Sequence, residues 1–136
     1  MIFVDTGAFY ARYHKADDHH ARSISGWSEI GSKRIPCLTT NLVVVETITL
    51  IGRDFGGKIA ADRAGAIYRS AFITIVRSSL EQELEAVLLL GKFADQRVQF
   101  ADCVSFVMMR RYKLKTVFGF DRHFEAAGFE LWPGKQ

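Results

Sequence analysis

The sequence contains few residues of the kinds that build metal clusters, disulfides or membrane spans. Cys37 and Cys103 are the only cysteines among 136 residues, and neither stands in a CxxC or similar ligand spacing. Two free thiols are typical of a reducing compartment, so we expect a cytoplasmic protein. No apolar run approaches the roughly 18 residues of a membrane span. The N-terminus has no basic segment followed by a cleavage site, and we expect no signal peptide.

Linkers, repeats and low-complexity tracts are also missing. The length suits one domain with one core over residues 1–136, and a hydrophobic content of 49% excludes a disordered chain. The formal net charge of +3 is compatible with a polyanionic partner. Because many ordinary domains carry a similar charge, it does not indicate a function by itself.

Short apolar strands alternate with helices along the chain. The expected strands are 2–4, 35–39, 71–76, 116–120 and 129–132. The expected helices are 8–14, 21–30, 41–54, 58–70, 78–94, a helix that begins near residue 100 and a short helix through residue 124. This alternation predicts an α/β fold with a parallel sheet and helices on both faces.

Several local signals set the element boundaries. Thr40 is a good N-cap for the helix that follows it. Ser78 and Glu81 have the spacing of a capping box for the helix 78–94. The β-branched segment 71–76 is expected to be a second buried strand. Helix 78–94 is expected to carry one apolar face, formed by Leu80, Leu84, Val87, Leu88 and Gly91.

Two of the expected strands end in an aspartate. Asp5 follows "IFV", and Asp121 follows "TVFGF". In open α/β sheets, sites form beyond the carboxyl ends of the strands, so both carboxylates are expected to point into one crevice. For either residue alone, capping of the following helix is the simpler explanation.

Two further acids lie in unusual positions. Glu46 lies within the apolar helix "NLVVVETITLI", where a lone carboxylate is costly to bury unless it pairs with a cation or with an Arg or Lys. Asp102 stands at the start of "QFADCVSF", where a negative charge is also favourable for the helix itself. Ser105, three residues later, shares a helical face with Asp102.

Taken together, these four acids predict a metal site. Clustered carboxylates repel one another and raise each other's pKa values, and a hard divalent ion removes that penalty. Oxygen ligands without a paired His or Cys set favour Mg²⁺ or Mn²⁺ over zinc. Such a site suits hydrolysis of a phosphodiester by a metal-activated water. Asp5 and Asp102 are expected as direct ligands, Glu46 reaches the ion or a bound water, and Asp121 completes the pocket.

The motifs "IFVDTGAFYA", "TTNLVVVET", "FADCVSFVMMRRYKLKTVFGFDRHF" and "FELWP" make the chain resemble a PIN-domain nuclease of the VapC toxin type. The resemblance implies a three-layer α/β/α sandwich with a central parallel sheet, ligation of Mg²⁺ or Mn²⁺ by Asp5, Glu46, Asp102 and Asp121, and cleavage of RNA. It also implies a homodimer and an antitoxin partner that covers the site. Thr6 and Ser105 match small hydroxyl residues that would hydrogen-bond the carboxylates or metal-bound waters. Gly7 and Gly119 depart from the family pattern, in which hydroxyl residues near these positions help to orient the ligands.

Arg12, Arg122 and His123 flank the acids and are candidates for contact with RNA phosphates. The tract "DDHH" at 17–20 is expected to be a hydrophilic loop rather than a metal site. Two other functions stay open at this point. The chain could be a PIN-domain nuclease that processes RNA without an antitoxin, or a non-catalytic PIN module that binds RNA or protein.

Overall fold

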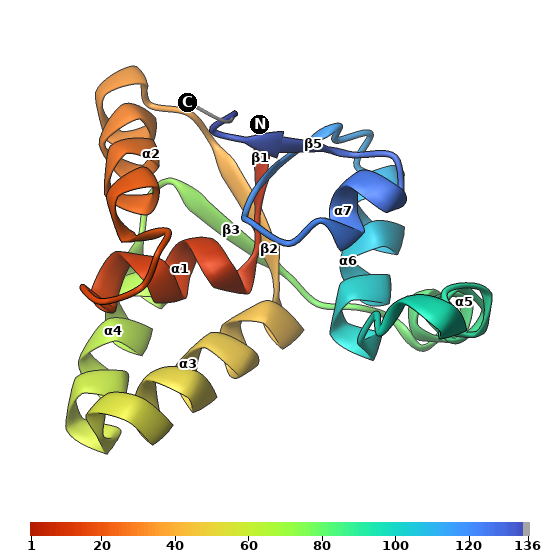
Figure 1. Ribbon diagram of the computed structural model, residues 1–136, viewed down its shortest axis with the longest axis horizontal. Helices are drawn as coiled ribbons and strands as arrows, with labels where there is room; N and C mark the ends of the chain where they lie inside the picture. The colour runs from red at the N-terminus through yellow and green to blue at the C-terminus, as the bar shows by residue number, and fades with distance from the viewer. Residues whose placement is uncertain (135–136) are drawn as a thin grey trace.

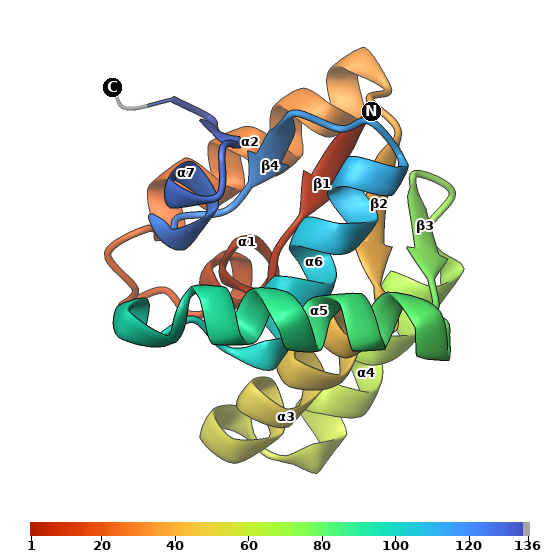
Figure 2. The ribbon, with the colours of Figure 1, turned by 90° about the vertical axis from the view of Figure 1, so that its right-hand side faces the viewer.

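In a computed structural model of the chain, residues 1–134 form a parallel five-stranded sheet with helices on both faces (Figure 1). Figure 2 shows α5 and α6 in front of the sheet and α1 and α2 behind it, which gives the expected α/β/α sandwich. The elements of the described residues are β1 (Ile2–Val4), α1 (Thr6–Tyr13), α2 (His20–Lys33), β2 (Cys37–Thr40), α3 (Asn41–Phe55), α4 (Gly57–Arg69), β3 (Ile73–Val76), α5 (Leu80–Lys92), the 3₁₀ turn η1 (Ala94–Gln96), α6 (Phe100–Arg111), β4 (Thr116–Phe118), α7 (His123–Ala126) and β5 (Glu130–Trp132).

The strand order places the first strand at the centre of the sheet. The order is β3-β2-β1-β4-β5, and every neighbouring pair is parallel. Phe3 of β1 pairs with Leu38 on one side and with Val117 on the other. From β1 the chain adds β2 and β3 on one side of the sheet, and it then crosses over to add β4 and β5 on the other side. The switch point of the topology therefore lies between β1 and β4. In open α/β sheets, this crevice at the carboxyl ends of the strands is where ligands bind.

The core is built around two central strands, of which β1 is wholly apolar and β2 carries the buried threonines Thr39 and Thr40 at its end. β1 and β2 are buried along their whole length, as expected for strands covered by helices on both faces. Aromatic rings fill the space beside them: Phe106 and Phe124 lie edge to face with ring centroids 5.1 Å apart. At Gly26 of α2, a Cβ atom would come within 2.6 Å of the Phe118 ring, so only glycine lets α2 approach β4 this closely.

Two expectations about the strands are wrong. The segment 71–76 forms a shorter strand, Ile73–Val76, that is only partly buried rather than a buried central strand. It lies at the edge of the sheet, where only one neighbour covers it, and β-branched residues suit edge and centre alike. The strand expected over 116–120 ends at Phe118, because Gly119 and Phe120 turn away toward Asp121.

The helix signals have mixed outcomes. Thr40 caps α3 as expected, and its hydroxyl accepts a hydrogen bond from the Val43 amide at 3.2 Å. The capping box of α5 begins one residue later than expected, at Ser79 with Gln82, while Ser78 donates to Glu83 instead. The apolar face expected for this helix is largely exposed to solvent; its exposed members are Leu80, Leu84, Val87 and Leu88.

Within residues 1–134, no helix combines the length and the apolar character that crossing a bilayer requires.

Candidate active site

The four predicted acids line one cavity beyond the carboxyl ends of β1 and β4. Asp5 follows β1, Glu46 lies in α3, Asp102 lies in the first turn of α6, and Asp121 precedes α7. The cavity has a volume of about 320 Å³. The structure therefore brings together side chains from four separate segments, as the sequence predicted. Their roles in chemistry stay a prediction.

Asp5 is the most enclosed of these acids. Its residue is only 7% exposed, and its backbone amide donates to the Phe118 carbonyl at 2.9 Å, which fixes it between the two strands. Burial, followed by the charges of Asp102, Glu46 and Asp121, raises the pKa of Asp5 to about 8. A cation in the cavity would oppose all of these causes.

Glu46 is held by a hydroxyl group rather than by a basic residue. The Thr6 hydroxyl donates to Glu46 Oε2 at 2.9 Å, so the predicted hydrogen bond from Thr6 to a carboxylate is confirmed. Among residues 1–134, Glu46 forms no ion pair with Lys, Arg or His. The alternative of a structural salt bridge is therefore not supported, and the carboxylate is also less deeply buried than its apolar helix suggested.

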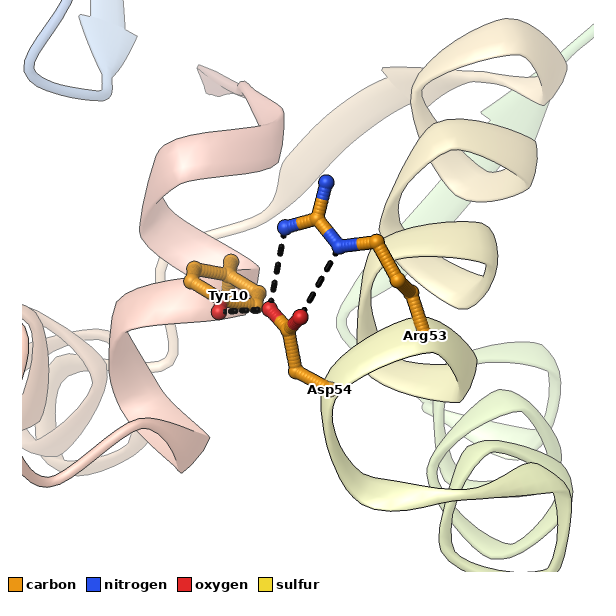
Figure 3. Close-up of polar contacts among 3 residues, drawn as sticks. All are labelled: Tyr10, Arg53 and Asp54. Atoms are coloured by element: carbon orange, nitrogen blue, oxygen red, sulfur yellow. Dashed lines mark hydrogen bonds and ion pairs between the residues drawn. The ribbon is translucent and has the colours of Figure 1, made fainter.

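Figure 3 shows a second contact between the same two helices, made by residues that do not line the cavity. The Tyr10 hydroxyl of α1 donates to Asp54 of α3, and Arg53 donates to both Asp54 oxygens at 2.8 and 3.1 Å. The Arg53 and Tyr10 hydrogen bonds lower the pKa of Asp54 to about 2. Since α1 and α3 are joined at Thr6 and again at Tyr10, the position of Glu46 relative to Asp5 is fixed at two points.

Asp102 serves its helix and the cavity at the same time. Its Oδ2 accepts a hydrogen bond from the Gln99 amide at 3.1 Å, which stabilises the first turn of α6. Burial raises its pKa to about 6, and the charges of Asp121 and Glu46 add to this effect, while the Gln99 hydrogen bond opposes it. Helix capping and a site role are therefore compatible at this position.

Asp121 is paired with a residue that the sequence suggested only as an RNA contact. Its Oδ1 accepts from the His123 amide at 2.9 Å and lies 3.0 Å from His123 Nδ1. Potential ligand atoms of Asp102, Asp121 and His123 lie within 4.8 Å of one another. His123 thus lines the acidic cavity itself and could contribute a nitrogen ligand there.

Three other predicted residues lie outside the acidic cavity. Ser105 is fully buried and donates to the Ala101 carbonyl at 3.1 Å, so the expected hydrogen bond to a carboxylate is wrong; a helical hydroxyl readily bonds the carbonyl four residues back. Arg12 packs over the Trp27 ring at 5.2 Å, on the α2 side of α1. Arg122 lines a neighbouring cavity.

The structure also adds residues that the sequence did not identify. They line the same cavity and are Asp17, His19, Arg97, Gln99 and Phe120. Two of them, Asp17 and His19, belong to the "DDHH" tract, which was expected to be a hydrophilic loop rather than a metal site but contributes to the lining of this cavity. Arg97 follows the turn η1 with a positive φ of 54° and adds a basic residue to the lining of a cavity whose charged residues are mainly acids.

The donor set fits a hard divalent cation. Carboxylate oxygens predominate. Burial and, to a smaller extent, neighbouring negative charges raise the pKa values of Asp5 and Asp102, and a bound cation would favour their ionised forms. Gly119, a departure from the family pattern, contributes space: a Cβ atom there would lie 3.1 Å from Asp5 Cβ. The glycine therefore allows a close approach to this carboxylate.

Comparisons with known proteins agree with this geometry. A family model described as "PIN domain" matches residues 2–130. The 23S rRNA-specific endonuclease VapC20 from two strains of Mycobacterium tuberculosis is 33% identical over 129 residues, which cover 95% of this chain and 95% of that protein. A crystal structure of M. tuberculosis VapC20, described as a sarcin-ricin loop cleaving toxin, superposes with a TM-score of 0.85 at 31% identity. It covers 95% of this chain and 96% of the other.

Proposed function

The chain belongs to the PIN-domain family, and on that premise we propose that it is a divalent-metal-dependent endoribonuclease, the toxin of a toxin–antitoxin pair. A single nuclease domain over residues 1–136 would carry this activity. The observation that carries the proposal is the convergence of Asp5, Glu46, Asp102 and Asp121 on one cavity at the switch point of the sheet.

Each residue of the acidic cavity would have a distinct role in metal binding or catalysis. Asp5 and Asp102 would hold Mg²⁺ or Mn²⁺ directly, since burial and neighbouring negative charges raise the pKa values of both carboxyl groups and a cation would offset these effects. Glu46, oriented by Thr6, would accept a proton or hydrogen bond from the attacking water. Asp121 and His123 would complete the ligand set. When bound, such an ion orients and acidifies a water and stabilises the leaving oxygen of the phosphodiester.

Arg97 gives the cavity a group that can bind the substrate. Arg97 lines a cavity whose other charged groups are mainly acids, and among residues 1–134 it forms no ion pair. A guanidinium binds a phosphate by paired hydrogen bonds, so Arg97 is suited to hold the scissile phosphate against the carboxylates.

We propose that the substrate is a loop of ribosomal RNA, by analogy with VapC20, which is described as cleaving the sarcin-ricin loop of 23S rRNA. The similarity to a toxin of this kind favours the toxin function over the two alternatives, which are a nuclease for general RNA processing and a binding module without catalysis. A cognate antitoxin would then cover the acidic cavity. A homodimer would bury the exposed apolar face of α5, formed by Leu80, Leu84, Val87 and Leu88.

Cleavage of a synthetic sarcin-ricin loop RNA, with and without Mn²⁺, tests the proposal. We expect the wild type to cut at one position only when the metal is present, and Asp5→Asn and Asp102→Asn to lose the activity. Asp62→Asn is a matched control, because Asp62 is an exposed acid of α4 that does not line the cavity. Equal cleavage by wild type and both site variants would identify a contaminating nuclease. Cleavage of many unrelated RNAs would instead favour the processing enzyme.

A further inference from the structure

A stacked pair of rings separates the acidic cavity from a second, larger one. The rings of His19 and Phe120 lie nearly parallel, with centroids 4.3 Å apart and planes inclined by 5°. Both side chains line the acidic cavity and also a neighbouring cavity of about 580 Å³. The two rings therefore form a common wall, with the proposed cleavage site on one side.

Arg22 of α2 supports the Phe120 ring of this wall. The Arg22 guanidinium carbon lies 5.1 Å from the centre of the Phe120 ring, and Arg22 Nη2 donates to the Pro133 carbonyl at 3.0 Å. Arg22 therefore ties α2 to the segment after β5 and holds Phe120 in place. The stack is built into the fold rather than formed by two loose surface rings.

The second cavity is lined by aromatic, basic and acidic side chains. Arg122 lines this cavity, is exposed to solvent and forms no ion pair within residues 1–134. Glu125 and Glu130 also line the cavity. These carboxylates would repel a phosphate, whereas they can accept hydrogen bonds from the amino groups of a nucleobase. The volume lies in the range of about 300–1,000 Å³ that is usual for ligand pockets.

We propose that this second cavity is a nucleobase subsite, in which a base next to the scissile phosphate stacks on the His19–Phe120 wall while Arg122 contacts the adjoining phosphate. The inference rests on the proposed nuclease function and adds a specific mode of substrate binding to it. Bases of single-stranded loops stack on aromatic and histidine rings, whereas the bases of a duplex are already stacked and paired. The subsite therefore selects an unpaired nucleotide.

Binding of a single-stranded RNA that carries the fluorescent base 2-aminopurine tests the subsite. The measurement is made in EDTA, so that binding is observed without metal-dependent cleavage. We expect wild-type protein to quench the fluorescence, and His19→Ala to weaken binding by about 5- to 150-fold with loss of quenching. His19→Phe keeps a flat ring and should keep both. Circular dichroism confirms that each variant is folded.

The phosphate contact has its own control. Arg122→Ala should weaken binding and reduce the slope of log Kd against log salt by about 0.7, as expected for one lost contact to a single strand. Arg77→Ala, a change at an exposed arginine that follows the opposite edge strand β3, should leave the slope unchanged. Equal losses in both arginine variants would indicate general charge attraction and would overturn the role of Arg122.

The possible results separate this inference from the proposed function. Unchanged affinity and quenching in His19→Ala, with normal Mn²⁺-dependent cleavage, would overturn the subsite and leave the nuclease standing. Binding that depends on His19, without any cleavage when Mn²⁺ is supplied, would support the subsite and overturn the nuclease. Loss of both binding and cleavage in His19→Ala, with both retained in His19→Phe, would support the two proposals together.

Discussion

The Thr6 hydroxyl donates to Glu46 Oε2 across 2.9 Å and thereby joins the first residue of α1 to the second turn of α3. Thr6 directly follows Asp5, so a single peptide unit connects this hydrogen bond to the most buried carboxylate of the site. The contact therefore sets the position of Glu46 relative to Asp5 before any ion or substrate is present.

Removal of the Thr6 hydroxyl should reduce metal affinity and cleavage activity more than it reduces the free energy of unfolding. Thr6→Val keeps the shape of a side chain that is only 7% exposed but leaves Glu46 without its donor. Loss of a group that orients a metal ligand typically costs 10- to 100-fold in metal affinity or activity. We expect a decrease of about that size in Mn²⁺-dependent cleavage, and near-normal activity in Thr6→Ser. Wild-type Mn²⁺ dependence in Thr6→Val would show that Glu46 needs no such orientation.

Close packing of α2 on the sheet gives a prediction about stability. In Gly26→Ala, the new Cβ atom would lie 2.6 Å from the Phe118 ring, which is fully buried and cannot easily move. Overpacking of this kind costs about 1–3 kcal/mol in the free energy of unfolding, measured by urea denaturation.

Gly31→Ala is the matched control for this variant. Gly31 belongs to the same helix, and no atom lies within 4 Å of the position that an alanine Cβ would occupy there. Because alanine favours a helix over glycine by up to about 1 kcal/mol, Gly31→Ala should stabilise the protein. Equal effects of the two substitutions would contradict the packing argument.

The sequence predicted that the four acids lie together because the signals for their positions are local. A strand that ends in aspartate places that carboxylate at the carboxyl edge of a parallel sheet whatever the rest of the chain does, and this holds for Asp5. The same logic reached Asp121, although the strand before it ends at Phe118 and not at Phe120. Glu46 could be identified because a carboxylate in an apolar helix is costly to bury unless it is paired or bound to a cation.

Other features depended on contacts that no local pattern encodes. Ser105 lies close to Asp102 in the sequence, but its hydroxyl is satisfied by Ala101 within its own helix. His19 reaches the cavity because the loop after α1 returns to Phe120, a tertiary contact between residues 101 positions apart. The burial of β3 could not be known before the strand order placed it at an edge.

The raised pKa of Asp5 predicts how the metal-free protein responds to pH. Its pKa rises from 3.8 to about 8 on folding, so between these values the folded state binds a proton that the unfolded state has released. The free energy of unfolding must then fall as the pH rises through this window. For a group this deeply buried, the loss is on the order of a few kcal/mol.

Urea unfolding in EDTA between pH 5 and pH 8 checks this prediction against Asp5→Asn. The amide is neutral at every pH, so the variant should gain stability relative to the wild type as the pH increases. Other titrating groups affect both proteins and largely cancel in the difference. Parallel stability profiles for the two proteins would show that Asp5 ionises normally and that the cavity does not oppose its charge.

Addition of Mn²⁺ should reverse this pH dependence. A ligand that binds only the folded state stabilises it by about 2.7 kcal/mol at a concentration 100-fold above its Kd. Because Asp5, with its pKa of about 8, and Asp102, with its pKa of about 6, must lose protons to bind the ion, the affinity should increase from pH 6 to pH 8. The Mn²⁺-induced rise in Tm should therefore be larger at pH 8 than at pH 6, much smaller in Asp5→Asn, and unchanged in Asp62→Asn. If the wild-type Tm at pH 8 is the same with and without saturating Mn²⁺, the prediction that a cation offsets the burial and mutual repulsion of these carboxylates is wrong.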